Sequence, residues 1–452
     1  MIRSRPILAL ISLAVSTAAG AQPLSRAEAV AAALSANPDV HKSLAEMGRL
    51  EGLITEARAD ALPDLTLSGS WSRYRDPALL NSSSFDAFPP ELRESLKPIP
   101  ANLYEGIAQL RQTLFSFKLG AAIRAARLGR SFGEEELRRV RQIVALSAVR
   151  AYNQHLLSLE QVRVAESSVR QKQNHLEMAR NRRAAGVATD LDVLRSQVDL
   201  ENARTQLMRL KGQTDLARGR LNAMMLRPIE TPVVPSDSLE YLALEMSVEQ
   251  AVQQAWSNRP EAKAIALAES IRDELIRVAR ADARPSLELT GVYGYSVRQP
   301  ENFLESDFSK WSASVTLKVP LFDGYRTAGR VAQARAERDK LTQDRLALEN
   351  QIRLDARDAV DVLNVARSIY EAAELNVAQA WKALDMTQAS YNHGAATLLD
   401  VLDAQAALTL AESNRIEALH AHANARAVLR FVMAQDPLDP PPATRPEAED
   451  RS

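Results

Sequence analysis

The chain carries one sequence pattern twice. A-R-A-D-A-L-P-D-L-T-L-S-G at 57–69 returns as A-R-A-D-A-R-P-S-L-E-L-T-G at 279–291, and the matches continue without a gap toward the start of each copy. Repetition over about half of a chain indicates that one structural unit is built twice. The sequence therefore predicts two repeats, 22–227 and 246–436, joined by a Pro-bearing linker at 228–245.

Each predicted repeat contains a long run without Gly or Pro. The runs cover 134–185 and 330–393, and apolar residues, mostly small ones, recur along the second run at spacings of three and four, so neighbouring helices can pack closely. At ~1.5 Å per residue, a helix over the second run would be about 96 Å long. Gly186 and Gly394 follow the runs, and Gly adopts the positive φ that a sharp reversal needs. Two helical hairpins are therefore predicted, at about 118–225 and 326–435.

Ahead of each hairpin the periodicity changes from helical to alternating. Apolar and polar side chains alternate in 65–73 and again, more regularly, in 287–298. A period of two indicates a β-strand with one apolar and one polar face. A second alternating segment follows each of these after a loop, which is long and rich in Pro and Ser in the first repeat. The four predicted strands lie at about 64–74, 104–115, 286–298 and 308–320.

The aromatic residues gather at these strands, since eleven of the 22 lie within or beside them. Strands of ~9–11 residues with aromatic ends are typical of the wall of a transmembrane β-barrel. A soluble sandwich would need a second sheet to cover the apolar faces, and the rest of the chain is predicted to be helical. The predicted fold class is therefore mainly α with a small membrane β part.

Four strands are too few to close a barrel, and lipid does not tolerate open sheet edges. The wall must then be shared between copies of the chain. Two copies would supply ~8 strands around an interior filled by side chains, whereas three would supply ~12 strands around an open lumen. The helices would continue this wall outside the membrane as a tube.

The two ends of the chain have the composition of segments outside the folded part. Arg3, Arg5, the apolar stretch 7–15 and the small residues that follow it form the three parts of a secretory signal peptide at 1–21. The apolar stretch is too short to span a bilayer as a helix. A Pro-rich, acidic tail at 437–452 is expected to be disordered.

Composition and motifs exclude several function classes. The chain has no Cys, which excludes disulfides, thiolate metal sites, Cys nucleophiles and a lipidated N-terminal Cys. The formal net charge of -1 gives no indication of a nucleic-acid partner. No P-loop, G-x-S-x-G or H-E-x-x-H motif is present, and His420 and His422 would face different directions on a helix. No enzyme activity, cofactor or metal site is therefore expected.

The two predicted reversals carry related motifs. R-x-x-G-x-x-T-x-x-D-V-L occupies 183–194, and Y-N-H-G-A-A-T-L-L-D-V-L-D-A-Q occupies 391–405. Together with the repeated helix–strand–strand–helix–helix plan, these motifs resemble the TolC-like outer-membrane efflux proteins over nearly all of the chain after the signal peptide. The resemblance implies a homotrimer, in which a twelve-stranded barrel in outer-membrane lipid continues into an α-helical tunnel in the periplasm.

The resemblance also implies a function. Such proteins are exit ducts of tripartite efflux or type I secretion systems, closed at their periplasmic tips until a periplasmic adaptor (membrane fusion) protein engages them, with energy supplied by an inner-membrane pump. An elongated periplasmic coiled-coil scaffold without a pore is the alternative, which accounts for the long helices and leaves the alternating strands without a purpose. A duct contacts its cargo weakly, so small-molecule efflux and protein export both stay open.

The match at the tips assigns site residues. Asp400 and Asp403 match family positions that ring the constriction, where carboxylates gathered by three-fold symmetry would repel one another and attract cations. Asp192 and Tyr391 match positions of the closing contacts. An exposed helix carboxylate or a packed Tyr is the structural alternative for each. The residues expected to shape the hairpin tips and dock the adaptor are Arg183, Gly186, Val187, Thr189, Leu194, Gly394, Thr397, Leu398, Val401 and Leu402.

One tip position departs from the family pattern. The family's well-known example has a basic residue two positions after the tip Gly of the second repeat, where it bridges to an Asp, and this chain has Ala396 there. A salt-bridge latch of that form is therefore excluded. Arg195, the repeat counterpart of Asp403, is a candidate for a different pairing, and hairpin packing is expected to contribute more to closure.

Overall fold

The structure is a computed structural model that describes residues 23–75, 77, 88–95 and 99–438. The predicted signal peptide, part of the Pro- and Ser-rich loop, and the tail beyond Leu438 lie outside the described residues. The described residues form two compact units, which we call the helical unit and the sheet unit. The helical unit takes its residues from 1–43, 137–262 and 348–452, and the sheet unit takes its residues from 44–136 and 263–347.

Each unit draws on both halves of the chain. Four helices contribute residues to both units: α2 (Pro38–Ala59), α4 (Phe117–Ala184), α7 (Pro260–Ala281) and α8 (Arg326–Asn392). The compact units therefore differ from the sequence segments 22–227 and 246–436, because these helices carry each half of the chain through both units.

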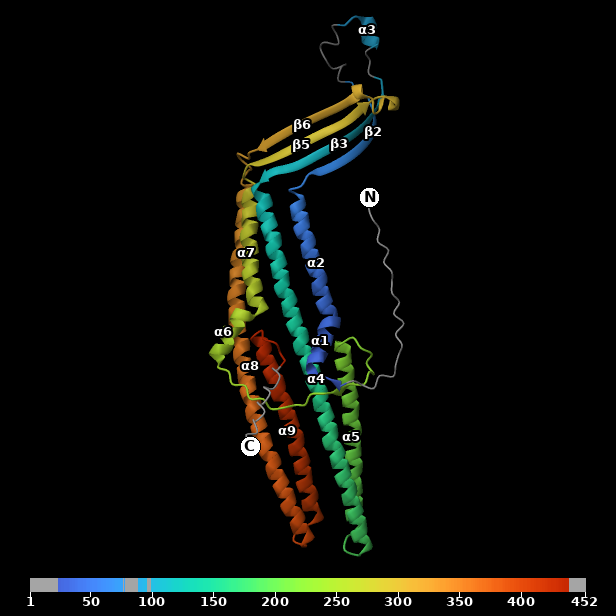
Figure 1. Ribbon diagram of the computed structural model, residues 1–452, viewed down its shortest axis with the longest axis vertical. Coiled ribbons are helices and arrows are strands. Elements are labelled where there is room, and N and C mark those ends of the chain that lie inside the picture. The colour runs from blue at the N-terminus through green and yellow to red at the C-terminus, as the bar shows by residue number, and fades with distance from the viewer. Residues whose placement is uncertain (1–22, 76, 78–87, 96–98, 439–452) are drawn as a thin grey trace, which may run out of the picture. The chain divides into compact units, whose positions relative to one another are not determined.

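The sheet unit holds one four-stranded antiparallel sheet (Figure 1). Its strands are β2 (Asp64–Tyr74), β3 (Ala101–Ser116), β5 (Ser286–Val297) and β6 (Ser309–Lys318), in the order β2-β3-β5-β6. The hairpins β2–β3 and β5–β6 each pair strands that follow one another along the chain, and the β3–β5 ladder joins the two hairpins. Strands β2 and β6 are thus the edges of this sheet. A short helix, α3 (Pro90–Ser95), lies between β2 and β3.

Strand β3 is longer and less regular than predicted. It begins at Ala101, because Ala101 pairs with Tyr74 and the ladder continues from there. Its register to β5 shifts at Leu114, which is skipped, so that Phe115 lies opposite Leu287. A bulge of this kind interrupts the alternation of the two faces from Leu114 onward, and ahead of it Gly106, Ile107 and Gln112 weaken the polar/apolar pattern.

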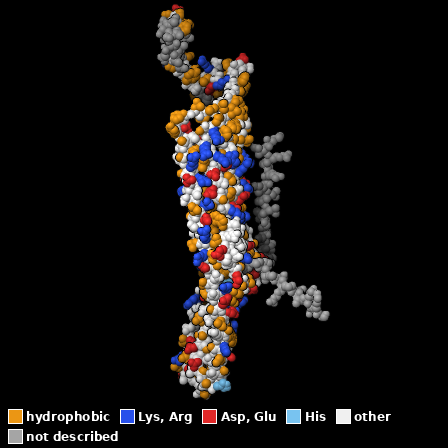
Figure 2. All heavy atoms as spheres, turned by 90° about the vertical axis from the view of Figure 1, so that its left-hand side faces the viewer, with side chains coloured by type: hydrophobic (Ala, Val, Ile, Leu, Met, Phe, Trp, Pro, Cys, Tyr) orange, Lys and Arg blue, Asp and Glu red, His pale blue; other side chains and the backbone are white. Residues whose placement is uncertain are grey.

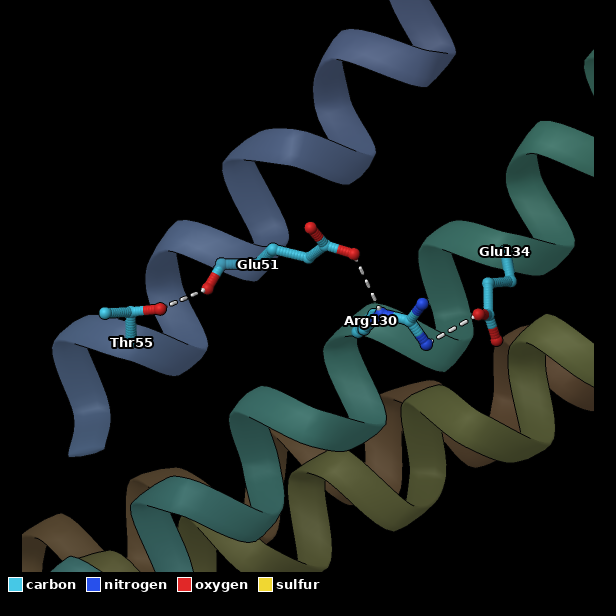
Figure 3. A network of polar contacts seen from close by, with 4 residues as sticks. All are labelled: Glu51, Thr55, Arg130 and Glu134. Carbon is cyan, nitrogen blue, oxygen red and sulfur yellow. Dashed lines mark hydrogen bonds and ion pairs between the residues drawn. The ribbon is translucent and has the colours of Figure 1, made fainter. Parts of the chain in front are cut away.

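Helices α2 and α4 contact each other inside the sheet unit. Arg130 of α4 forms an ion pair with Glu51 of α2 (Nε–Oε1 3.5 Å) and another with Glu134, one turn along α4 (Nη1–Oε1 2.7 Å; Figure 3). Solvent-exposed ion pairs contribute about 0–1 kcal/mol each. A Cβ on Gly133 would overlap Leu50, so the absence of a side chain at Gly133 lets α2 pack against α4.

The helical unit contains further helices, α1 (Arg26–Ala36), α5 (Asp190–Met224), α6 (Val248–Asn258) and α9 (Leu398–Val432). Ser25 and Ser247, which the sequence indicates as N-caps, form capping boxes with Glu28 and Gln250 at the starts of α1 and α6. The core is built mainly from Ala, Leu and Val side chains. Among the described residues, no helix combines the length and the apolar character needed to cross a membrane.

Two short strands hold the linker against the helical unit. Strand β1 (Pro23–Leu24) pairs in parallel with β4 (Val234–Pro235). The buried Tyr152 hydroxyl of α4 donates a hydrogen bond to the Leu24 carbonyl (2.7 Å), and burial raises the pKa of Tyr152 to about 12. The linker is therefore an ordered part of the helical unit.

Candidate functional site

The α4–α5 and α8–α9 turns lie at the same end of the helical unit (Figure 1). Gly186 (φ 74°) and Gly394 (φ 77°) take the left-handed conformation in these turns. The amides of Val187 and Ala395 then donate to the carbonyls five residues earlier, at 2.9 Å in both turns. This Schellman arrangement favours Gly, as expected from the sequence, because other residues are strained at positive φ.

The second helix of each hairpin begins with a capping box. The Thr189 hydroxyl accepts from the Asp192 N–H (3.2 Å), and the Asp192 carboxylate accepts from the Thr189 N–H (2.9 Å) and hydroxyl (2.8 Å). Thr397 and Asp400 make the same three contacts at 3.2, 2.7 and 2.7 Å. The Thr189 N–H and then its hydroxyl lower the pKa of Asp192, and the Thr397 hydroxyl and then its N–H lower the pKa of Asp400. Both carboxylates are therefore held in place and ionised.

Tyr391 lies at the end of α8, where it contacts two different parts of the helical unit. Its side chain packs against a buried cluster of Leu384, Val401 and Leu408 inside the α8–α9 hairpin. The Arg182 guanidinium, from the end of α4, lies over the Tyr391 ring at 4.6 Å from the ring centroid. A cation above an aromatic face is attracted to it, so this contact joins the two hairpins near their tips.

A groove of about 500 Å³ lies between the first turns of α5 and α9. Leu191 and Leu194 of α5 line it together with Leu399 of α9. Arg195 and Asp403, the two residues considered for an alternative pairing, line the same groove. Lys172 and Asp199 also line the groove, so its lining combines apolar side chains with charges of both signs.

The residues expected to dock the adaptor differ in exposure. Val187 and Leu194 are 65% and 59% exposed, whereas Leu398 and Leu402 are partly buried. Val401 is 2% exposed and packs within the α8–α9 hairpin, so the structure gives it a core role and leaves no surface for a partner.

The remaining tip residues maintain the geometry of the turns. Thr189 and Thr397 are the helix caps, and Gly186 and Gly394 form the turns themselves. Arg183 forms an exposed ion pair with Asp190 across the first turn (Nε–Oδ1 2.5 Å). Asp403 is exposed on α9, about one turn beyond Asp400 of the capping box.

The sheet has one apolar face, which extends over all four strands. Residues paired across neighbouring strands share a face, and one such row runs Leu67, Ala108, Tyr293 and Trp311. Leu67 is 83% exposed and Trp311 is 76% exposed. The apolar face is formed mainly by Leu65, Leu67, Trp71, Tyr104, Ala108, Leu110, Leu287, Leu289, Tyr293, Tyr295, Val297, Trp311, Ala313, Val315 and Leu317.

The opposite face of the sheet is mainly polar and carries ion pairs. Lys310 of β6 contacts Glu105 of β3 (Nζ–Oε1 2.8 Å), and Arg111 of β3 contacts Glu288 of β5 (Nε–Oε1 3.3 Å). Ser and Thr residues occupy most of the other positions on this face. A thin sheet with an exposed apolar face and a charged opposite face is suited to separate lipid from water.

No group of metal-ligating residues is found in the described ranges. His422 is buried with its ring 4.6 Å from that of Tyr241, and His420 hydrogen-bonds to Asn424 (2.9 Å). The two imidazoles therefore have different surroundings, and they do not form a metal pair.

Comparison with known proteins decides the family. The family described as "Outer membrane efflux protein" matches residues 29–225 and 251–435. The chain belongs to the outer membrane efflux protein family. The predicted resemblance to the TolC-like outer-membrane efflux proteins is thereby confirmed, and the family's name places its members at the outer membrane.

Individual outer membrane efflux proteins and solved structures are similar over most of this chain. Nodulation protein T of Rhizobium leguminosarum bv. trifolii is 24% identical over 408 residues, which cover 88% of this chain and 83% of that protein. Outer membrane protein OprJ of Pseudomonas aeruginosa is 24% identical over 378 residues, covering 82% and 76%. A crystal structure of a membrane protein from Pseudomonas aeruginosa has a TM-score of 0.77 at 22% identity, covering 90% of this chain and 92% of that one. The last comparison shows a shared fold.

Two features of this outer membrane efflux protein were not recognised from its sequence. The T-x-x-D spacing at 189–192 and 397–400 is a variant of the capping-box signature, so a sequence signal for the caps was present. Arg182 gave no comparable signal, because its contact with Tyr391 joins residues that are far apart in the chain.

Proposed function

We propose that the protein is the passive outer-membrane exit duct of a tripartite efflux or type I secretion system. The observation that carries this proposal is the two-faced sheet. An exposed apolar face of this extent is unfavourable in water and suited to lipid. The ion pairs Lys310–Glu105 and Arg111–Glu288 lie on the other face, where a water-filled lumen would solvate them.

The sheet edges support assembly with further copies of the chain. Strands β2 and β6 end the sheet in a single copy, and open edges are not tolerated in lipid. Pairing of β6 in one copy with β2 in the next would remove both edges. Three copies would bring twelve strands, enough for an open lumen, whereas two copies would give an interior filled by side chains. The proposed assembly is a homotrimer with its helices in the periplasm, built from two repeats at 22–227 and 246–436.

The proposed gate lies at the hairpin tips. Asp400 and Asp403 from three copies would gather their carboxylates around the opening, where they would attract cations. Asp192 would act there by holding the start of α5, because its carboxylate accepts hydrogen bonds from the N–H and hydroxyl of Thr189, the N-cap residue. Ala396 removes the family-type salt bridge, and the contact of Arg182 with Tyr391 is the proposed substitute that keeps the hairpins together.

The proposed adaptor-docking surface is the exposed apolar part of the first tip and the adjoining groove. Val187, Leu191 and Leu194 are exposed there, and the groove between α5 and α9 has room for side chains of a partner helix. An inner-membrane pump would supply the energy, so the duct needs no catalytic group. The pump would also select the cargo, because the duct contacts cargo weakly.

A substitution test follows from the two faces of the sheet. Leu67→Lys with Trp311→Lys places two charges on the apolar face, and Ser68→Lys with Ser312→Lys places two charges on the polar face of the same strands. A Lys near the middle of the lipid costs about 2–4 kcal/mol. We expect the first variant to be lost from the outer-membrane fraction. The second variant should remain there and conduct with altered ion selectivity.

The wild-type protein provides the direct test of the duct. Protein extracted in detergent should have the mass of a trimer and form conducting pores in planar bilayers. A monomer without conductance would refute the duct. A protein that washes out with the soluble periplasm would favour the alternative, an elongated periplasmic coiled-coil scaffold without a pore.

A further inference from the structure

The helical segments next to the sheet are strongly basic. Residues 117–130, 274–285 and 319–335 contain ten Lys and Arg residues and three Asp and Glu residues, although the whole chain is close to neutral. We call these ten cations the basic collar. Figure 2 shows Lys and Arg side chains gathered beside an apolar zone on the face that carries α7 and α8. The collar lies within the sheet unit.

The few carboxylates in these segments do not neutralise the collar. Asp282 contacts both Lys118 (Nζ–Oδ1 3.6 Å) and Arg330, so one negative charge is shared between two cations. Glu274 likewise contacts both Arg124 (Nη2–Oε2 2.9 Å) and Arg277 (Nη1–Oε1 2.7 Å). The exposed cations that form no ion pair with a carboxylate of the described chain are Arg127, Arg280, Arg284, Arg326 and Arg335.

An exposed apolar and aromatic belt adjoins the collar. Leu321 is 94% exposed, and Phe322 and Tyr325 are each 77% exposed. The Arg284 guanidinium lies over the ring of Phe117 at 4.7 Å from its centroid. Aromatic rings with cations directly beside them are typical of the interface between acyl chains and headgroups.

The opposite end of the sheet has charges of both signs, with Arg73, Arg298 and Lys310 near the strand ends and acidic residues in the β5–β6 loop. The β5–β6 loop, residues 299–308, contains three Asp and Glu residues and no Lys or Arg. The strong excess of positive charge is therefore confined to the helix-proximal end of the sheet. Because the sheet is the proposed membrane segment, this end would lie at the leaflet that faces the periplasm.

We propose that the basic collar binds anionic phospholipid headgroups of that leaflet. The proposal rests on the proposed function, which embeds the sheet in lipid. Positive side chains at a membrane surface attract anionic headgroups, and Arg can bind a phosphate through two N–H groups at once. Acyl chains of the same lipids would lie against Leu321, Phe322 and Tyr325. The collar would thus fix the depth at which the duct sits in the membrane.

Native mass spectrometry of the purified full chain tests this proposal. Protein from detergent is mixed with equal amounts of phosphatidylglycerol and phosphatidylcholine, and the lipid that stays bound to the assembly is counted. We expect the wild type to retain several-fold more phosphatidylglycerol. Arg280→Gln with Arg284→Gln and Arg326→Gln should lower this preference several-fold. The matched control, Arg170→Gln with Arg209→Gln and Arg220→Gln, removes three exposed cations of the helical unit and should leave it unchanged.

Three results would overturn the proposal. An unchanged lipid preference in the collar variant would show that the collar does not bind headgroups. If inorganic phosphate at millimolar concentration removes as much bound phosphatidylglycerol from the wild type as the collar substitutions do, the collar is a site for soluble phosphate. Dissociation of the assembly in the collar variant, at unchanged lipid preference per copy, would show that these arginines contact a neighbouring copy. Pore formation in pure phosphatidylcholine bilayers is measured separately, and its absence in the wild type would refute the duct itself.

Discussion

The two hairpin tips share one backbone and differ in what their side chains offer. Both have a left-handed Gly followed by a Thr–Asp capping box, with nearly equal hydrogen-bond distances. At the first tip the apolar residues Val187 and Leu194 are exposed, and Asp190 is paired with Arg183. At the second tip Leu399 is 52% exposed, whereas Val401 is buried more completely than Val193, its counterpart at the first tip.

The charges of the two tips differ as well. The R-x-x-G motif gives the first tip Arg183 where the second tip has Tyr391, and Arg195 follows the first cap where Asp403 follows the second. The first tip therefore combines an exposed apolar surface with compensated charge, which suits docking. The second combines a packed core with carboxylates in excess, which suits a gate. Identical local geometry thus supports two different proposed roles.

The largest expected difference between the tips concerns burial. Val401→Asp would place a carboxylate in the core with Leu384 and Leu408, which we expect to cost about 3 kcal/mol or more. Val187→Asp changes an exposed residue and should cost less than about 0.5 kcal/mol. Hydrogen exchange of the α8–α9 amides should accelerate strongly in the first variant and stay unchanged in the second. Equal protection in both would contradict the core role of Val401.

The same pair of variants sharpens the proposed division of roles. Val187→Asp should leave the fold intact and weaken binding of the cognate adaptor several-fold, because a charge then lies on the apolar docking surface. Binding measured by surface immobilisation of the duct would report this loss. Full-strength binding would remove the first tip from the docking surface.

The next difference concerns ion selectivity. Asp400→Asn with Asp403→Asn removes two charges per copy, and Asn at 400 still accepts the hydrogen bonds of the Thr397 cap. We expect the preference for cations over anions to fall several-fold, as read from reversal potentials across planar bilayers in a salt gradient. Asp190→Asn with Asp192→Asn also removes two charges per copy, at the first tip, and a much smaller shift is expected because the proposed constriction is lined by Asp400 and Asp403. Equal selectivity shifts in the two variants would contradict the assignment of the gate to the second tip.

Regular local patterns allowed much of the fold to be predicted from the sequence. The alternation in 65–73 locates β2 to within a residue or two, and the Gly/Pro-free runs locate α4 and α8. The turns were predictable because Gly186 and Gly394 each stand alone at the end of a long run. These features depend on residues close together in the chain.

Features that depend on distant residues could not be predicted in the same way. The order β2-β3-β5-β6 follows from a pairing between the two halves of the chain, and no local pattern encodes it. The bulge at Leu114 likewise depends on the pairing of β3 with β5, which lies in the other half of the chain. Burial of Val401 and the contact of Arg182 with Tyr391 both depend on how helices pack, whereas the tip leucines and Val401 look alike in sequence.

Equal effects are expected where the two tips are built alike. Thr189→Ala and Thr397→Ala each remove a capping hydroxyl, which typically costs about 1 kcal/mol. We expect hydrogen exchange in the first turns of α5 and α9 to accelerate about fivefold in the respective variant, since 1.4 kcal/mol corresponds to a tenfold change. Thr189→Ser and Thr397→Ser keep the hydroxyl and should keep the protection. A large effect at one tip alone would show that the caps differ in spite of their geometry.

The caps also predict a dependence on pH. The pKa values of Asp192 and Asp400 are lowered below the ordinary value of 3.8, so the folded state favours the ionised form. The stabilisation is fully present above pH 3.8 and is lost as the pH falls through the lowered values. Carboxyl chemical shifts of the two residues should therefore titrate below the ordinary value of 3.8. Titration at or above the ordinary value would argue against the capping boxes.

The smallest expected effect concerns the link between the tips. Arg182→Gln removes the guanidinium from the Tyr391 ring, a contact that we expect to contribute about 0.5–1 kcal/mol. If this contact holds the gate closed, the open probability of single channels in planar bilayers should rise about two- to fivefold. Arg183→Gln removes the neighbouring charge, whose partner Asp190 lies in the same tip, and should change the open probability less. Tyr391→Leu should abolish the difference between Arg and Gln at 182, because the ring that attracts the guanidinium is then missing. An effect of Arg182→Gln that persists in the Tyr391→Leu background would assign the closing role of Arg182 to a different contact.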